Sequence, residues 1–138
     1  MPERRIWDRL RSSAGVTAIV PAVRITPVRM FQGDDRPAIT FQVISRVMEN
    51  HSTGALTCGV VRLQLNLWAD TYERVKALAD AVRVALTGWR EAGTGTRITM
   101  VHLDSESDAP EMVDPGSATG AHCVRQDWLS EFVTDGTT

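Results

Sequence analysis

The chain has 138 residues, 43% apolar and 23% charged, which is typical of one soluble globular domain large enough to bury a core. A net charge of −2 and a pI near 5.9 disfavour a protein that binds nucleic acid by neutralising phosphates. No apolar run approaches the roughly 20 residues of a membrane span, and the N-terminus lacks the apolar stretch of a secretory signal. We therefore expect synthesis in the cytoplasm, with no membrane partner and no sequence-specific nucleic-acid binding.

The first part of the chain predicts a helix and two strands. Residues 3–13 are expected to form a short helix, and a second apolar piece, Val16–Ala22, follows it. Arg24–Phe31 is predicted to be a strand, which Pro27 confines to a sheet edge because proline donates no hydrogen bond. Ala38–Val47 alternates as a strand, with Ile39, Phe41 and Val43 facing opposite to Thr40, Gln42 and Ile44.

The middle of the chain switches from strand periodicity to helix periodicity. Four apolar residues alternate with Arg62, Gln64 and Asn66, as a half-buried strand requires: Val61, Leu63, Leu65 and Leu67. A helix over Thr71–Thr87 should cover them with the stripe Val75, Leu78, Val82 and Leu86. The polar residues Arg62, Gln64 and Asn66, on the opposite face of the strand, should be more exposed. Asp70 is expected to cap its start, with Glu73 three residues on, and Gly88 to end it.

The last third predicts two more strands. Arg97–Leu103 follows a Gly/Thr connector at Ala92–Thr96, and His122–Val133 closes the chain, with a bulge expected near Trp128-Leu129. The polar segments Glu49–Gly54 and Ser105–Gly120 are predicted to be loops.

This order of elements predicts a single α+β domain over residues 1–138. We expect a mainly antiparallel, mixed sheet of about five strands with two helices packed on one face. Flexible loops are expected at about 48–57 and 105–120, and a frayed tail at 134–138.

The candidate chemical groups do not form a recognisable catalytic pattern. His51, His102 and His122 have no zinc-binding spacing, and a metal site from His102, His122 and Asp104 would need two neighbouring strands. Surface or half-buried histidines are the simpler interpretation. We expect no metal, no cofactor and no catalytic residue.

The other reactive or ligand-like segments have equally simple interpretations. Cys58 and Cys123 lie in no catalytic signature and are expected to be thiols rather than a disulfide. The glycines of Ala92–Thr96 follow a helix, which is the wrong order for a phosphate loop. The acid-serine alternation over 104–108 lacks the glycine and closing glutamate of a calcium loop, so a solvated loop is expected.

Four segments, in this order and spacing, resemble the tail-completion or tail-terminator family of long-tailed bacteriophages and prophage-derived elements. They are the first helix leading into Val16–Val20 and Val23–Pro27, the segment Asp35–Phe41, the strand and helix start Val61–Glu73, and the final Arg125–Leu129. The chain departs from that pattern in the Gln32–Arg36 turn and in its long last loop.

The resemblance implies a structural virion protein of the tail or neck, not an enzyme. Members form a ring, commonly a homohexamer, which caps the tail tube and joins it to the head-side connector or stopper protein, with DNA passing through the lumen. A ring needs head-to-tail contacts. Because aromatic side chains concentrate at interface centres, we expect Trp68 or Trp128 to be buried by a neighbouring subunit rather than by its own core.

Two other functions stay open from the sequence. Another phage neck component, such as a head-completion or stopper protein, would share the size and the assembly habit. A small α+β enzyme or ligand-binding domain would need a pocket lined by residues such as Trp68, Tyr72 and His102.

Overall fold

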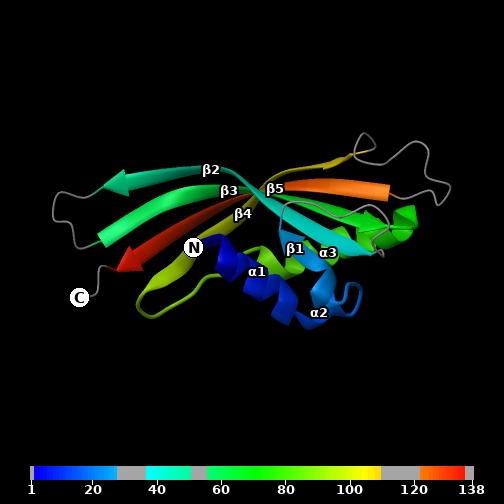
Figure 1. Cartoon of the computed structure of the whole chain (residues 1–138), viewed down its shortest axis with the longest axis horizontal. Helices are drawn as coiled ribbons and strands as arrows, with labels where there is room; N and C mark the ends of the chain where they lie inside the picture. The colour runs from blue at the N-terminus through cyan, green and yellow to red at the C-terminus, as the bar shows by residue number, and fades with distance from the viewer. Residues whose placement is uncertain (1, 28–36, 51–55, 110–121, 136–138) are drawn as a thin grey trace.

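The computed structural model describes residues 2–27, 37–50, 56–109 and 122–135, drawn as ribbons in Figure 1. The elements along the chain are α1 (Pro2–Ser12), α2 (Ala14–Thr17), the 3-10 helix η1 (Ala22–Arg24), β1 (Ile25–Pro27), β2 (Ala38–Asn50), β3 (Leu56–Ala69), α3 (Tyr72–Leu86), β4 (Thr96–Asp108) and β5 (His122–Asp135). The strands form one sheet in the order β1-β2-β3-β5-β4. The short β1 runs parallel to β2, and the other pairs are antiparallel. The predicted α+β fold with a mixed sheet is confirmed.

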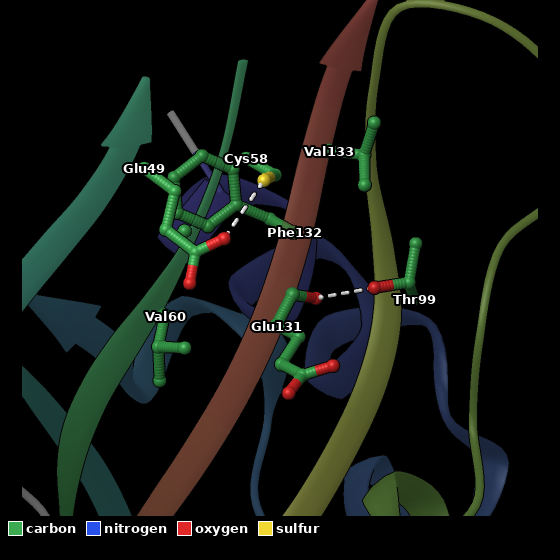
Figure 2. A pocket seen from close by; sticks show the side chains of 8 residues that line it. Glu49, Cys58, Val60, Thr99, Glu131, Phe132 and Val133 are labelled. Carbon is green, nitrogen blue, oxygen red and sulfur yellow. Dashed lines mark hydrogen bonds between the residues drawn. The ribbon is translucent and has the colours of Figure 1, made fainter. Parts of the chain in front are cut away.

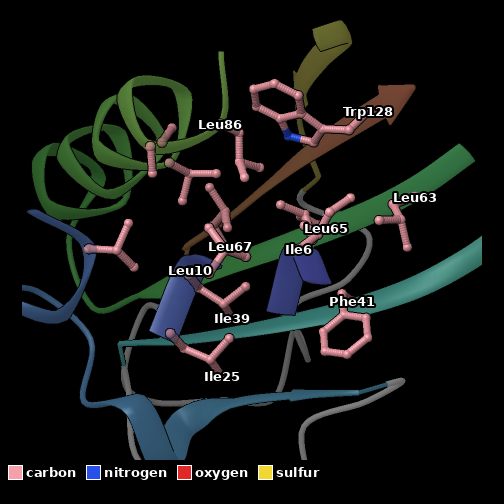
Figure 3. Packing of buried hydrophobic residues seen from close by; sticks show 14 of the residues in the cluster. Ile6, Leu10, Ile25, Ile39, Phe41, Leu63, Leu65, Leu67, Leu86 and Trp128 are labelled. Carbon is pink, nitrogen blue, oxygen red and sulfur yellow. The ribbon is translucent and has the colours of Figure 1, made fainter. Parts of the chain in front are cut away.

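All the helices lie on one side of the sheet (Figure 1). The side chains of Leu63, Leu65 and Leu67 face them and are at most 1% exposed. They pack in one cluster with Val75, Leu78, Val82 and Leu86 of α3. Figure 3 shows the three strand leucines and Leu86 in this cluster. The predicted register of β3 against α3 is therefore confirmed, and β1 is an edge strand, as Pro27 indicated.

The opposite side, here called the open face, carries no described helix. Arg62 and Gln64 are half-buried there, as expected, but Asn66 is only 4% exposed, so its predicted exposure is wrong. The reason is a small second cluster next to Asn66 on the same face, which covers that end of the sheet. It consists of Ala38, Trp68, Ala109 and Cys123.

Helix α3 begins one residue later than the cap prediction placed it. Thr71 is the N-cap residue, with its hydroxyl accepting from the Arg74 N–H at 3.1 Å, so the assignment of Asp70 as the cap is wrong. Thr71 has the extended backbone that an N-cap side chain needs to reach back to the first turn. At the other end, Gly88 has φ +74°, the left-handed conformation expected after the helix.

The strands extend further than predicted. β2 continues to Asn50, β3 starts at Leu56, β4 continues to Asp108 and β5 to Asp135, so these parts of the predicted loops and tail are wrong. Backbone pairing is the reason, because Glu49 still pairs with Cys58 although both side chains are outside the core. The rest of those segments, His51 included, and the second half of the predicted Arg24–Phe31 strand lie outside the described residues.

The bulge predicted near Trp128 lies on the neighbouring strand instead. β5 pairs with β3 without interruption. β4 has two irregularities, one at Ile98/Met100 and one at Leu103/Ser105, and the second lies opposite Trp128 and Asp127. β2 has a further bulge at Val43/Ser45. Extra residues bend a strand and increase its twist, so β5 stays regular while its edge partner bends.

Candidate functional site

The residues proposed as a possible metal site are not brought together. His102 pairs with Leu129, whereas His122 pairs with Ala69, which places them seven residues apart along β5, or about 20 Å. Asp104 forms an ion pair with Arg62 at 2.9 Å. Within the described residues, no group of three potential metal ligands is close enough to hold an ion.

The residues of the possible ligand pocket are also separated. Trp68 lies in the small cluster under Ala109, and Tyr72 is 49% exposed with its ring 6.1 Å from that of His122. His102 is exposed on β4 of the open face. These three side chains therefore do not line one pocket. No helix in the described part of the chain is long and apolar enough to cross a membrane.

The two candidate interface tryptophans are both covered by their own chain. Trp128 is 0% exposed in the main core, and Trp68 is 8% exposed, with its indole N–H 3.5 Å from the Thr40 hydroxyl. This corrects the expectation that one ring needs a neighbouring subunit to bury it. Contact of a neighbour with the small exposed part of Trp68 stays a prediction.

Trp128 is buried because the chain satisfies its indole N–H. Its Nε1 donates to Gln126 at 3.0 Å, and Gln126 donates in turn to the Ala79 carbonyl of α3 at 3.2 Å and to Glu106 at 2.7 Å. Gln126 is itself 0% exposed. Buried polar groups are stable only when they are hydrogen-bonded. Trp128 and Gln126 lie two residues apart on a strand, so both side chains are on the helix-facing side. This spacing is the feature of the sequence that could have predicted a buried Trp128 with its own hydrogen-bond partner.

The acidic end of β4 is paired within the chain. Asp104, Glu106 and Asp108 contact Arg62, Arg83 and Lys76, at 2.9, 2.6 and 2.6 Å respectively. Asp108 raises the pKa of Lys76, through its hydrogen bond first and its charge second. All three carboxylates therefore have cationic partners: Arg62 on β3, beyond β5, and Arg83 and Lys76 on α3.

The other end of the sheet, beyond the helices, has apolar side chains on the open face. Val47, Val60, Glu131 and Met100 form one row across β2, β3, β5 and β4. Val47 is 63% exposed and Met100 is 40% exposed. This row, together with Glu49 and Cys58 beside it, is here called the distal patch.

Four residues of the distal patch line a shallow hollow of about 220 Å³: Glu49, Cys58, Val60 and Glu131. Figure 2 shows Val60, Glu131 and Thr99 projecting in front of the strands, with the helices behind. The Cys58 thiol donates to the Glu49 carboxylate at 3.5 Å, and partial burial and this hydrogen bond raise the pKa of that thiol. The hollow is smaller than the about 300–1,000 Å³ of most small-molecule sites, so it suits one or two side chains of a protein partner better than a cofactor.

Comparison with known proteins gives two findings. Residues 4–112 match the family described as "Tail completion protein gp17". A chain from a solved structure, "Virion of native gene transfer agent (GTA) particle", has a similar fold, with a TM-score of 0.68 and 14% identity, over 93% of this chain and 91% of that one. No curated protein sequence matches the chain. Because the family match spans most of its length, the chain belongs to the tail completion protein gp17 family and is a structural protein of the phage virion, located in its tail or neck.

Proposed function

We propose that this protein is a tail terminator, which assembles as a ring, most simply a homohexamer, at the head-proximal end of the tail tube. There it stops tube polymerisation and presents a docking surface to the head-side connector. The match to the tail completion family over residues 4–112 carries this proposal. The proposal assigns the protein no catalytic activity and no cofactor.

The surface of the subunit supports a ring assembled head to tail. Such a ring requires two different surfaces on each subunit, one meeting the other on its neighbour. The helix-covered side and the open face of the sheet differ in this way (Figure 1). The distal patch exposes apolar area where the described chain provides no cover. The net charge of −2 also suits a lumen through which DNA passes without binding.

The test is electron microscopy of the purified protein, alone and mixed with its tail tube protein. We expect rings, with or without the tube protein, and rings at one end of each tube, together with tubes that stop growing once capped. Strictly monomeric protein that leaves tube growth unchanged would contradict the proposal. Rings that bind the head-side connector but not the tube would favour the stopper protein instead.

A further inference from the structure

The sheet has two edges, and in the described part of the chain each edge is only partly covered. On one side β1 pairs with β2 over Ile39–Phe41, and no described strand lies beside the rest of β2. On the other side β4 is the last strand. Its backbone is covered at Ile98, whose N–H donates to the Glu91 carboxylate at 3.0 Å and whose carbonyl accepts from the Glu91 N–H at 2.7 Å. Uncovered strand edges are sites for pairing with another chain.

The uncovered parts of the two edges occupy the same rows of paired residues across the sheet. The stretch Ser45–Val47 of β2 and the stretch Met100–His102 of β4 form the two ends of three consecutive rows. Neither stretch contains a bulge. A straight continuation of these rows from one copy into the next would therefore place the two stretches side by side.

The side chains at the two ends of the distal row are apolar and exposed. Val47 is 63% exposed at the β2 end, and Met100 is 40% exposed at the β4 end. Both side chains lie on the open face, so they become direct neighbours when the row continues into a second copy. The surface that the subunit leaves uncovered thus has its apolar side chains where an edge-to-edge contact would bury them.

The hydrogen-bonding directions of the backbone also match. Because the backbone of Ile98 is bonded on the outer side of β4, its partner Phe132 on β5 directs its N–H and carbonyl to β3. This direction alternates along a regular strand, so Ser130 also bonds β3, and Val101 opposite it directs its own groups out of the sheet. The same alternation directs the N–H and carbonyl of Arg46 outward from β2, at the other end of that row.

We propose that adjacent subunits join their sheets edge to edge, with Met100–His102 of one subunit pairing antiparallel with Ser45–Val47 of the next. This inference rests on the proposed ring. β2 and β4 run in opposite directions within the sheet, so copies related by rotation about an axis along the strands meet as antiparallel strands. The two edges differ, so the contact is heterologous and repeats until the ring closes. It covers the end of the distal patch nearest Cys58.

Disulfide formation across the junction tests this pairing. The variant carries Val47→Cys and Met100→Cys, together with Cys58→Ser to remove the half-buried native thiol. Within one subunit the two positions are separated by three strand spacings, about 14 Å, which is too far for a disulfide. Mild oxidation of assembled rings should therefore link subunits into multimers up to the full ring on a non-reducing gel. Each single variant should give dimers at most.

An exposed valine elsewhere provides the matched control. Val84 is 82% exposed on α3, so Val84→Cys combined with Met100→Cys should give no multimers. A second measurement uses Val47→Lys, which places a charge at the junction and should raise the half-assembly concentration roughly tenfold or more, whereas Val84→Lys should leave it unchanged. Circular dichroism of each variant establishes that the subunit still folds.

The outcomes separate this contact from the proposed function. If the wild type forms rings, but rings of the Val47/Met100 variant stay unlinked or Val47→Lys assembles as well as Val84→Lys, the edge pairing is wrong and the proposed function stands. Linkage of Val47→Cys to the tube protein instead of a second subunit would also overturn the edge pairing. If the wild type forms no ring even with the tube protein, the proposed function itself fails.

Discussion

The two halves of β2 have similar apolar content and opposite surroundings. From Ala38 to Phe41 every side chain is buried, at 7% exposure or less, because the main core covers one face of that half and the small second cluster around Trp68 covers the other. From Ile44 to Glu49 every side chain is exposed, including Ile44, Val47 and Met48. The change begins at Gln42, which is already exposed, just before the Val43/Ser45 bulge. Apolar residues in a strand therefore identify a surface that must be covered, but not whether the covering comes from the same chain.

The largest expected difference between these regions is in stability. Leu65→Ala removes a side chain with 0% exposure from the helix-facing core and should cost about 2–5 kcal/mol in the free energy of unfolding. Val47→Ala, in the exposed half of β2, should change it by about 0.5 kcal/mol or less. Urea denaturation of the monomer measures both. Equal losses for the two variants would break the distinction between covered and uncovered halves.

The second prediction concerns the β2–β3 pair beyond the helices. A Cβ added at Gly59 would lie 2.3 Å from the Val47 carbonyl oxygen and 3.1 Å from the Phe132 ring. Gly59→Ala should therefore separate the strands locally and cost about 1–3 kcal/mol, although this end carries little core. Gly15→Ala is the control, since a Cβ added at Gly15 would lie 3.9 Å from the Ser13 hydroxyl, an ordinary contact distance. Amide exchange at Met48 should increase in the first variant and not in the second.

The smallest expected effect is at the start of β4, where Glu91 connects that strand to α1. Its carboxylate accepts from Arg5 and from the Ile98 N–H, and the Arg5 hydrogen bond holds the pKa of Glu91 below its ordinary value near 4.5. A carboxyl whose pKa is lower in the folded state stabilises the protein fully at pH values above its unfolded-state pKa. This stabilisation is lost as the pH falls through the folded-state pKa. Because Arg5 is 45% exposed, Glu91→Gln should cost about 1 kcal/mol or less at pH 7.

The pH dependence of the unfolding free energy distinguishes the charge effect of Glu91 from a packing effect. The difference between wild type and Glu91→Gln should narrow as the pH falls below 4.5, because the wild-type carboxyl is then protonated. Thermal unfolding at several pH values measures it. A difference that stays constant across this range would mean that the charge of Glu91 contributes nothing.

The parts of the fold that were predictable follow from side-chain periodicity. The alternation of Leu63, Leu65 and Leu67 and the stripe from Val75 to Leu86 specify the strand, the helix and their contact. Strand ends were not predictable, because backbone pairing such as Glu49 with Cys58 does not depend on burying side chains. The acids of β4 looked like a loop because their cationic partners lie 23 or more residues away along the chain.

The candidate site was less accessible to sequence reasoning. Tryptophan suits both cores and interfaces, and the choice for Trp128 depended on Gln126 satisfying its N–H. The distal patch was missed because Val47 and Val60 have the residue types of a core strand. They are uncovered because their side chains lie on the open face, where the described chain places no helix (Figure 1).

The native thiol in the distal patch reports directly on whether assembly covers this surface. Cys58 is half-buried in the subunit, whereas Cys123 is 5% exposed and serves as an internal reference. The measurement is the rate of maleimide labelling at Cys58, located by mass spectrometry, in isolated subunits and in assembled rings. The account predicts slower labelling of Cys58 in the ring, with Cys123 slow in both states; equal rates at Cys58 in subunit and ring would contradict it.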